Sequence, residues 1–405
     1  MKPSFEFQRP RSPDDYEQIY GVMRRAFPEE PVDEIVRRFV EQHPEMTWEH
    51  FFMVKNEGVV IAVLVLIPQR WVLSDIELKV AEMGCVGTDP DYRGMGAQRI
   101  LNDKFDEYAA NQGYDLCVLA GIPYLYRQFG YNYAVDLDFK TAIETRKITG
   151  TECKLQVRAF KETDIPRARE LLEISQSKHL VHSKRTPEIW LLQHKTDTYG
   201  AEPFEAFSLI DGAEAVAYIR LSQESDALII REMGYVSEEY VEKALGCIRE
   251  MAERKRLKKI VSKLHYSHPL TRLLVKDGGK SNDPYAWQVK IIDYERIIGR
   301  LKPLLEKRIR RSSYRGLTET INLNFWKFNI RMEIEDGEIK TISRSKETRD
   351  RNIGLNPYVF PKLMLGYRSI DELEYSYPDC IINPEYRQLV RTLFPKGTGF
   401  IHYTY

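Results

Sequence analysis

A strand-to-helix junction at residues 82–101 combines residue types that can hold a phosphate group. It runs Glu-Met-Gly-Cys-Val-Gly-Thr-Asp-Pro-Asp-Tyr-Arg-Gly-Met-Gly-Ala-Gln-Arg-Ile-Leu, apolar at its start and helical in character at its end. Glycines let the backbone approach an anion closely, and the N–H groups at a helix start attract negative charge. Arg93 adds a positive charge that pairs well with phosphate oxygens. The junction predicts a phosphate cradle, and an ordinary turn eased by glycine is the alternative.

Other reactive side chains give weaker signals. The histidine pair His265-x-x-His268 has no carboxylate or cysteine at ligand spacing, so we interpret it as structural and expect no metal. His43 and His50 precede a predicted hairpin and are expected to be ordinary surface groups. Because the cysteines are odd in number and scattered, with no CxxC pair, neither a disulfide framework nor a zinc site is expected; they are Cys85, Cys117, Cys153, Cys247 and Cys380.

The elements that position the junction follow an α/β order. Helical spacing of apolar residues comes first, then two β-rich runs that meet at Glu57-Gly58 as a hairpin, then the junction. A short buried strand and a helical segment follow it. The ranges are Tyr16–Phe27 and Val32–Gln42 for the first helices, Phe51–Lys55 and Val59–Ile67 for the hairpin, Leu116–Ala120 for the strand and Ile122–Gly130 for the last segment.

The chain then repeats itself. The pattern Glu-Met-Gly-x-Val at 82–86 recurs at 232–236, and an arginine and aspartate six apart recur at nearly the same offset, as Arg9 and Asp15, then Arg158 and Asp164. Two matches at almost one offset indicate internal duplication. The second copy continues as Ser-Glu-Glu-Tyr-Val-Glu, without an arginine-glycine loop. Only the first copy is therefore expected to bind a phosphate.

A third, α+β domain is expected from about residue 294. Apolar residues alternate with polar ones at 328–335, and Asp336-Gly337 is typical of a hairpin turn. The predicted elements are helices at Tyr294–Arg308, Val359–Leu365 and Tyr386–Leu393, and a β-prone end at Gly399–Tyr405. The predicted domains are therefore 1–150, 151–293 and 294–405.

Bulk composition narrows the class of protein. The 405 residues include 60 basic and 60 acidic side chains, so no net charge draws the chain to nucleic acid or to an anionic membrane. A basic neighbourhood at 254–259 lacks interleaved aromatics, which disfavours nucleic-acid binding. The longest apolar run, Val59–Ile67, is far short of the roughly 20 residues that span a bilayer. The charged start lacks a signal-peptide core, so a cytoplasmic location is expected.

The unit V-x-T-x-P-x-Y-R-G-x-G, residues 86–96, resembles the acetyl-CoA-binding motif of the GNAT acetyltransferases. There, an arginine and glycines begin the central helix and cradle the CoA pyrophosphate; here Gln98 replaces the last small residue. The chain resembles in particular the enhanced-intracellular-survival (Eis) acetyltransferases, along essentially its whole length. Further matches are Leu-Tyr-Arg-Gln-Phe-Gly-Tyr at 125–131, Leu-Gly-Tyr-Arg-Ser at 365–369 and Leu-Phe-Pro at 393–395.

This resemblance implies tandem GNAT domains, the second degenerate, followed by a sterol-carrier-like α+β domain. It implies direct attack of an amine on the acetyl-CoA thioester, with a bulged strand receiving the pantetheine. The cofactor-binding residues would be Val86, Gly87, Thr88, Arg93, Gly94, Met95, Gly96, Ala97 and Gln98. Tyr126 would be the general acid, since a tyrosine with an ordinary pKa near ~10 is protonated at neutral pH. Tyr124, Tyr131 and Tyr133 lie nearby, and a simple aromatic of the groove is the alternative for Tyr126.

The resemblance also implies that the C-terminal carboxylate of Tyr405 is the base. A carboxylate with a pKa near ~3.5 is a weak base unless it is desolvated, so it would orient the amine as much as deprotonate it. A frayed terminus is the alternative, although the end is apolar. The acids of Glu29 to Glu34 could attract a cationic amine, but acids are common at a helix start.

The expected function is acetyl-CoA-dependent N-acetylation of a small-molecule or peptide amine, by a homo-oligomer such as a hexamer, with no nucleic-acid or membrane partner. A catalytically silent CoA-binding regulator or scaffold is the alternative. Both need the Arg93 loop, and only the first needs Tyr126 and the terminal carboxylate.

Overall fold

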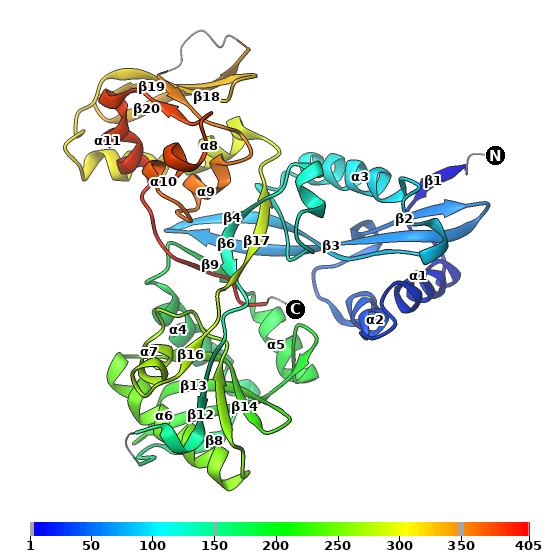
Figure 1. Cartoon of the computed structure of the whole chain (residues 1–405), viewed down its shortest axis with the longest axis vertical. Helices are drawn as coiled ribbons and strands as arrows, with labels where there is room; N and C mark the ends of the chain where they lie inside the picture. Colours follow the sequence, from blue (N-terminus) through cyan, green and yellow to red (C-terminus); the bar gives the residue numbers. More distant parts are fainter. Residues whose placement is uncertain (1–3, 150–151, 347–351, 404) are drawn as a thin grey trace. The chain divides into compact units, whose positions relative to one another are not determined.

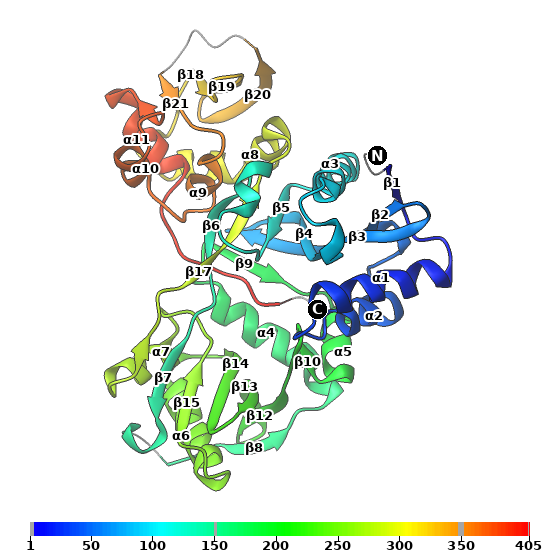
Figure 2. The same cartoon turned by 45° about the vertical axis from the view of Figure 1, so that its right-hand side comes forward.

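The computed structural model of the chain describes residues 4–149, 152–346, 352–403 and 405. The chain forms two compact units, each assembled from separate segments (Figures 1 and 2). Unit 1 comprises Met1–Val135, Leu180–Lys184 and Trp287–Gly399. Unit 2 comprises Asp136–His179, Arg185–Ala286 and Phe400–Tyr405. The division of the chain into three domains stays a prediction.

The first sheet has the order β1-β2-β3-β4-β5-β17-β6, and β9 pairs with β3. Helix α3 covers one face of this sheet, and α1 and α2 lie on the other (Figure 1). The strands are β1 (Phe5–Gln8), β2 (Phe51–Asn56), β3 (Val59–Leu73), β4 (Ile76–Thr88), β5 (Leu116–Leu119), β6 (Asn132–Leu137), β9 (Val181–Lys184) and β17 (Tyr285–Lys290). The helices are α1 (Pro13–Ala26), α2 (Val32–Gln42) and α3 (Ala97–Asn111), with short 3-10 turns η1 (Trp48–His50), η2 (Pro90–Tyr92) and η3 (Leu125–Phe129).

The second sheet has the order β16-β7-β15-β14-β13-β12-β8. One of its faces packs on α6 and α7, and residues of α4 and α5 form a separate core around Tyr218. The strands are β7 (Thr141–Glu144), β8 (Gln156–Ala159), β12 (Glu205–Asp211), β13 (Glu214–Glu224), β14 (Ala227–Tyr235), β15 (Lys259–Ser262) and β16 (Lys280–Ser281), and a small hairpin pairs β10 (Thr198–Tyr199) with β11 (Glu202–Pro203). The helices are α4 (Ile165–Gln176), α5 (Pro187–Thr196), α6 (Glu238–Arg254) and α7 (Pro269–Lys276), with η4 (Thr145–Lys147) and η5 (Glu162–Asp164).

The repeat seen in the sequence extends to the strand order. The run β1-β2-β3-β4-β5 corresponds to β8-β12-β13-β14-β15, with β4 and β14 carrying the two Glu-Met-Gly segments. Each sheet is then completed by a strand from the far end of the other copy. Strand β17 lies between β5 and β6, and β7 lies between β15 and β16. The sequence gives no sign of this exchange, because a strand's pattern does not say which sheet it joins.

The remaining segment of unit 1 carries a sheet of order β20-β19-β18-β21-β22. Phe328, Ile330, Met332 and Ile334 are all buried, as their alternation predicts. The strands are β18 (Glu319–Asn324), β19 (Asn329–Glu335), β20 (Glu338–Ser345), β21 (Ile353–Gly354) and β22 (Ile381–Ile382), and the helices are α8 (Tyr294–Arg310), α9 (Phe360–Met364), α10 (Ile370–Ser376) and α11 (Pro384–Leu393). The last strand, β23, covers only Gly399–Phe400. The expectation of a β-prone run to the last residue was therefore too long.

A disulfide joins Cys153 to Cys247 on α6, across 94 residues of sequence. The expectation of no disulfide was wrong, because the spacing of cysteines along a chain does not report their distance after folding. The pair ties the segment before β8 to the helix that covers the sheet of unit 2.

Among the described helices, none is long and apolar enough to cross a membrane.

Candidate active site

Strand β4 carries a bulge at the centre of the first sheet. Val63 on β3 lies opposite Gly87 and Val65 lies opposite Gly84, so Cys85 and Val86 together face Leu64. Cys85 has a φ of 46°, which bends the strand locally. A Cβ added at Gly84 would lie 2.6 Å from Cδ1 of Ile67, so a larger residue there would displace the end of that side chain. Burial raises the pKa of the Cys85 thiol to about 12, so this side chain stays protonated.

The bulge lies where β4 and β5 part. Their parallel ladder covers three pairs and ends at Glu82 with Val118, while β4 continues to Thr88. On its other edge β5 pairs with β17, from Cys117 facing Lys290 to Leu119 facing Gln288. A strand that runs on past its neighbour directs backbone N–H and C=O groups sideways. An extended ligand can pair with such groups in the manner of an added strand.

The loop after β4 presents backbone N–H groups at the start of α3. Gly94 has a φ of 76° and Gly96 a φ of 95°, both in the left-handed region that glycine adopts at little cost. Gly96 is the N-cap of α3, and no side chain caps the helix. A Cβ added at either glycine would meet nothing within 4 Å, so the loop surface is open there. An uncapped helix start beside an open glycine loop suits an anionic group.

Arg93 is held over this loop by two backbone carbonyls. Its Nε donates to O of Thr88 at 3.4 Å, and its Nη2 donates to O of Ala26 at 3.3 Å. Among the residues that the structure describes, no acidic side chain forms an ion pair with Arg93. Its positive charge is therefore not neutralised by a neighbouring acid. The base of the loop is fixed by Arg25, whose Nε lies 2.6 Å from Oδ2 of Asp89.

Gln98, the departure from the family pattern, braces the loop. Its Nε2 donates to Oγ1 of Thr88 at 2.8 Å and to O of Gly87 at 3.3 Å. The first turn of α3 is therefore tied to the end of β4. Met95 is half exposed at 50%, and Ala97 is buried. These contacts hold the predicted cofactor residues in one continuous segment.

Tyr126 lies in η3 and packs against the same apolar core as Val86 and Ala97. Its ring forms an edge contact with Tyr131, 6.3 Å between ring centroids. Gly121 permits this position, since a Cβ there would lie 2.5 Å from Cε2 of Tyr126. Burial raises the pKa of Tyr126 to about 12, which keeps its hydroxyl protonated at neutral pH. Of the nearby tyrosines, Tyr124 is 77% exposed and Tyr131 is buried.

Glu82 is a buried acid that the motifs in the sequence did not single out. It lies at the last pair of the β4–β5 ladder, where Nε2 of Gln69 donates to its carboxyl group. Trp71 in turn donates from Nε1 to Oε1 of Gln69 at 2.8 Å, which fixes the orientation of the amide. Burial raises the pKa of Glu82 to about 8. The only signal in the sequence was the repeated Glu-Met-Gly segment.

The predicted base lies in unit 2. The terminal O of Tyr405 accepts from the N–H of Gly200 at 2.7 Å and from Nε2 of Gln193 at 3.4 Å. The end of the chain is therefore bound within unit 2 rather than frayed. Gln193 and Gly200 had no signal in the sequence, because neither lies in a motif.

Several histidines are buried, among them His43, His50 and His265. His43 and His50 are 6% and 8% exposed, so the expectation that they are surface groups was wrong. Burial lowers the pKa of His43 to about 4 and that of His265 to about 3. His265 packs in a ring cluster with Phe139 at 4.6 Å. In the part of the chain that the structure describes, no group of three or more histidine, cysteine or acidic side chains could hold a metal ion.

A groove of about 740 Å³ lies at the N-terminal end of α1, away from the loop that contacts the C-terminal end of this helix. Tyr16, Tyr20 and Trp48 line it together with Glu17 and Arg37. Arg37 lies 4.1 Å over the ring of Tyr20 and 3.3 Å from Glu17, so these two charges are paired with each other.

Comparison with known proteins agrees with this geometry. The family model described as an acetyltransferase (GNAT) domain matches residues 8–134. No curated protein matches the sequence significantly. Solved structures match along nearly the whole chain at low sequence identity, which shows a shared fold.

One similar structure is a GCN5-related N-acetyltransferase from Anabaena variabilis, with a TM-score of 0.76, 19% identity, and 98% of this chain and 99% of that chain covered. A probable N-acyltransferase from Enterococcus faecalis has a TM-score of 0.77 at 15% identity, with the same coverage. Eis1 from Mycobacterium abscessus has a TM-score of 0.66 at 14% identity, again over 98% of this chain and 99% of that chain. The bulged strand, the glycine loop and Tyr126 all lie inside the matched range, and residues 8–134 of this chain are a GNAT acetyltransferase domain.

Proposed function

We propose that this protein is an N-acetyltransferase that transfers the acetyl group of acetyl-CoA to the amine of a small molecule or peptide. The observation that carries the proposal is the continuous path from the bulge of β4, past the end of the β4–β5 ladder, to the uncapped start of α3. This path offers backbone groups to the extended pantetheine arm of CoA and N–H groups to its phosphates. The GNAT match over residues 8–134 supports the same chemistry.

Bound acetyl-CoA would supply an activated thioester that the acceptor amine attacks directly. In this proposal the backbone of Val86, Gly87 and Thr88 holds the pantetheine arm. The loop Arg93–Gln98 holds the pyrophosphate, with the guanidinium of Arg93 as its fixed charge. Support comes from the two carbonyl contacts that orient Arg93 and from the open surface at Gly94 and Gly96.

Proton transfer completes the reaction. An acceptor that arrives as a cation first releases one proton to solvent; as the C–N bond then forms and the C–S bond breaks, the neutral amine gives up a second proton and the departing sulfur gains one. Tyr126 would supply the sulfur's proton from its hydroxyl, which its raised pKa keeps protonated. The terminal carboxylate of Tyr405 would receive the amine's proton and attract a cationic acceptor. Support for this role comes from the two hydrogen bonds that hold the O of Tyr405.

The wider architecture is part of the proposal. We assign residues 1–150 to the catalytic GNAT domain, 151–293 to a degenerate GNAT-like domain and 294–405 to a sterol-carrier-like α+β domain. The protein would act in the cytoplasm as a homo-oligomer such as a hexamer. A silent CoA-binding scaffold is the second candidate, and it is favoured only by the loop, which both functions need.

A C-terminal extension distinguishes these functions. We would measure thiol release from acetyl-CoA with a panel of amines, comprising aminoglycosides, polyamines, small amino compounds and lysine peptides. The native protein, one with a short C-terminal tag and one with the same tag at its N-terminus would be compared. We expect turnover with at least one amine, a severe loss for the C-terminal tag only, and unchanged CoA binding. No turnover with any amine despite CoA binding would favour the scaffold, and full turnover of the C-terminally tagged enzyme would exclude the terminal carboxylate as base.

A further inference from the structure

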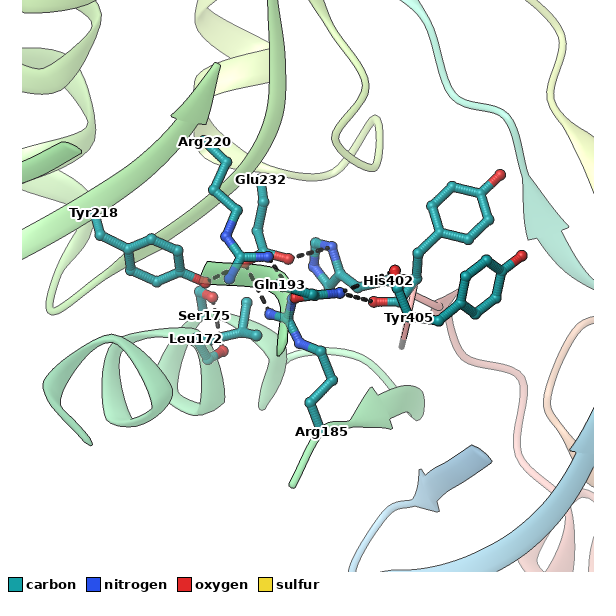
Figure 3. A network of polar contacts seen from close by, with 10 residues as sticks. Leu172, Ser175, Arg185, Gln193, Tyr218, Arg220, Glu232, His402 and Tyr405 are labelled. Carbon is teal, nitrogen blue, oxygen red and sulfur yellow. Dashed lines mark hydrogen bonds and ion pairs between the residues drawn. The ribbon is translucent and has the colours of Figure 1, made fainter. Parts of the chain in front are cut away.

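We propose that the second copy of the repeat positions the chain's C-terminal carboxylate, through a buried polar network centred on Glu232 and Gln193. This inference rests on the proposed role of that carboxylate as the base. Its consequence is that the copy without a phosphate loop holds the group proposed as the base. Figure 3 shows the residues of the network.

The C-terminal segment lies where the strands of the second copy part. The β14–β15 ladder ends with Ile230 facing Ser262, and β14 continues to Tyr235. Glu232, two residues past the last pair, is completely buried, and Nδ1 of His402 lies 3.3 Å from its Oε2. Beyond the end of β15, the ring of Phe400 contacts the ring of His265, with 6.0 Å between the two centroids. The segment thus occupies the place in this copy that corresponds to the strand opening beside Glu82 in the first.

Glu232 anchors the network as a carboxylate. Its Oε1 accepts from Nη2 of Arg185 at 2.8 Å and from the hydroxyl of Tyr218 at 2.7 Å, and Nε of Arg220 lies 3.5 Å away (Figure 3). Burial alone would raise the pKa of Glu232, but the two guanidinium groups hold it well below its usual range. Burial also lowers the pKa of His402 to about 3, so a neutral imidazole lies beside the Glu232 carboxylate.

Gln193 connects the two arginines to the end of the chain by hydrogen bonds. Its Oε1 accepts from Nη1 of Arg185 at 2.7 Å and from Nη1 of Arg220 at 2.6 Å. Because both arginines face the oxygen, the amide NH₂ must face the other way. It donates to O of Tyr403 at 3.2 Å and to the terminal O of Tyr405 at 3.4 Å (Figure 3). The arginines therefore fix which side of Gln193 meets the carboxylate.

A second donor fixes the same oxygen. Gly200, in the two-residue turn between β10 and β11, has a φ of 63° and directs its N–H to the terminal O of Tyr405 at 2.7 Å. A carboxylate oxygen held by two donors from separate elements has little freedom to rotate. Positional control of this kind is what a catalytic base requires.

Gln193→Glu tests the inference because it alters one side of the residue only. A glutamate would still accept from Arg185 and Arg220, but it cannot donate to the tail and it would repel the terminal carboxylate. We expect faster amide exchange at 401–405 and a kcat lower by about 10- to 100-fold, as one lost hydrogen bond to a charged group predicts. The affinity for CoA, measured by calorimetry at one site per chain, should not change.

Gln223→Glu is the matched control. It makes the same change of side chain at an exposed position near the end of β13. This variant should leave exchange at 401–405 and kcat unchanged. Gln193→Met, uncharged and of similar size, serves if Gln193→Glu does not fold, and it should show the same two effects.

The outcomes separate this inference from the proposed function. Unchanged tail exchange in a folded Gln193→Glu protein would overturn the inference, and so would faster exchange with unchanged kcat. Neither result changes what the C-terminal tag shows about the base. If the tagged enzyme keeps full turnover, the base is wrong and this inference falls with it, even where the tail exchange has changed.

Discussion

Two glutamates occupy equivalent places in the two copies of the repeat, and their surroundings differ in charge. Glu82 on β4 has an amide as its partner, from Gln69, and burial raises its pKa to about 8. Glu232 on β14 has two arginines, a tyrosine hydroxyl and a neutral histidine, and its pKa lies well below the usual range. At neutral pH the first is therefore mostly a carboxylic acid and the second a carboxylate.

This difference shows how duplication separates two roles on one backbone. In the first copy the strand bulge follows Gly84 and leads to a glycine loop with an uncapped helix start. In the second the register shift comes earlier, between Arg220 and Leu221, and α6 begins at Glu238 without such a loop. The second copy has buried charged groups where the first has an opening, and one of them, Glu232, contacts His402 of the C-terminal segment.

The largest effect should come from the first copy. Tyr126→Phe keeps the ring in its core and removes only the hydroxyl, so we expect turnover to fall by roughly 10²–10⁴-fold while CoA affinity changes little. Single-turnover kinetics with the best amine would measure the chemical step. Tyr124→Phe, at an exposed neighbour, is the control and should retain turnover. Equal turnover of both variants would show that Tyr126 is a structural aromatic.

The next prediction tests the charged network through the free energy of unfolding. Glu232→Gln preserves shape but leaves Arg185 and Arg220 buried beside a neutral group, so we expect the free energy of unfolding of unit 2 to fall by about 3–5 kcal/mol. Native-state hydrogen exchange on β14 and α5 would report it. Glu224→Gln is the comparison, because Glu224 contacts Arg231 with its side chain 53% exposed, and its loss should cost no more than about 1 kcal/mol. Similar costs for the two variants would contradict the account of the network.

Local patterns predicted much of this molecule. Helix α2 and the start of the hairpin at Phe51 follow the predicted ranges, and the alternation at 328–335 gave the buried side of β19. Such features depend on residues close together in the chain. Likewise, the glycine loop could be predicted because a left-handed φ angle is a local property that favours glycine, as at Gly94 and Gly96.

Long-range arrangement could not be read in the same way. The exchange of β7 and β17, the Cys153–Cys247 disulfide and the burial of His43 all depend on which distant segments meet. Gln193 is the clearest example of this. In the sequence it is an ordinary helix residue, and its proposed role depends on its hydrogen bonds with Arg185, Arg220 and the C-terminal segment. Its role follows from three segments that have no common motif.

The smallest effect concerns Glu82 and has the opposite sign to that of Glu232. A carboxyl group whose pKa rises from 4.5 to about 8 on folding contributes stability that is present below pH 4.5 and is lost as the pH rises through 8. Glu82→Gln cannot ionise and so escapes this loss. Relative to the native protein, the variant should gain about 2 kcal/mol in free energy of unfolding between pH 5 and pH 7, since one pKa unit corresponds to about 1.4 kcal/mol.

Taking the difference between two proteins at each pH removes the contributions of the other titrating groups. Denaturant unfolding of unit 1 at pH 5, 6 and 7 would measure it. Glu232→Gln, measured by the unfolding of unit 2, is the control: above pH 5 Glu232 is ionised in both the folded and the unfolded state, so the cost of that substitution should stay constant. A Glu82→Gln difference that is equally flat would mean that Glu82 is ionised in the folded protein, and the contrast between the two glutamates would then be one of partners and not of charge.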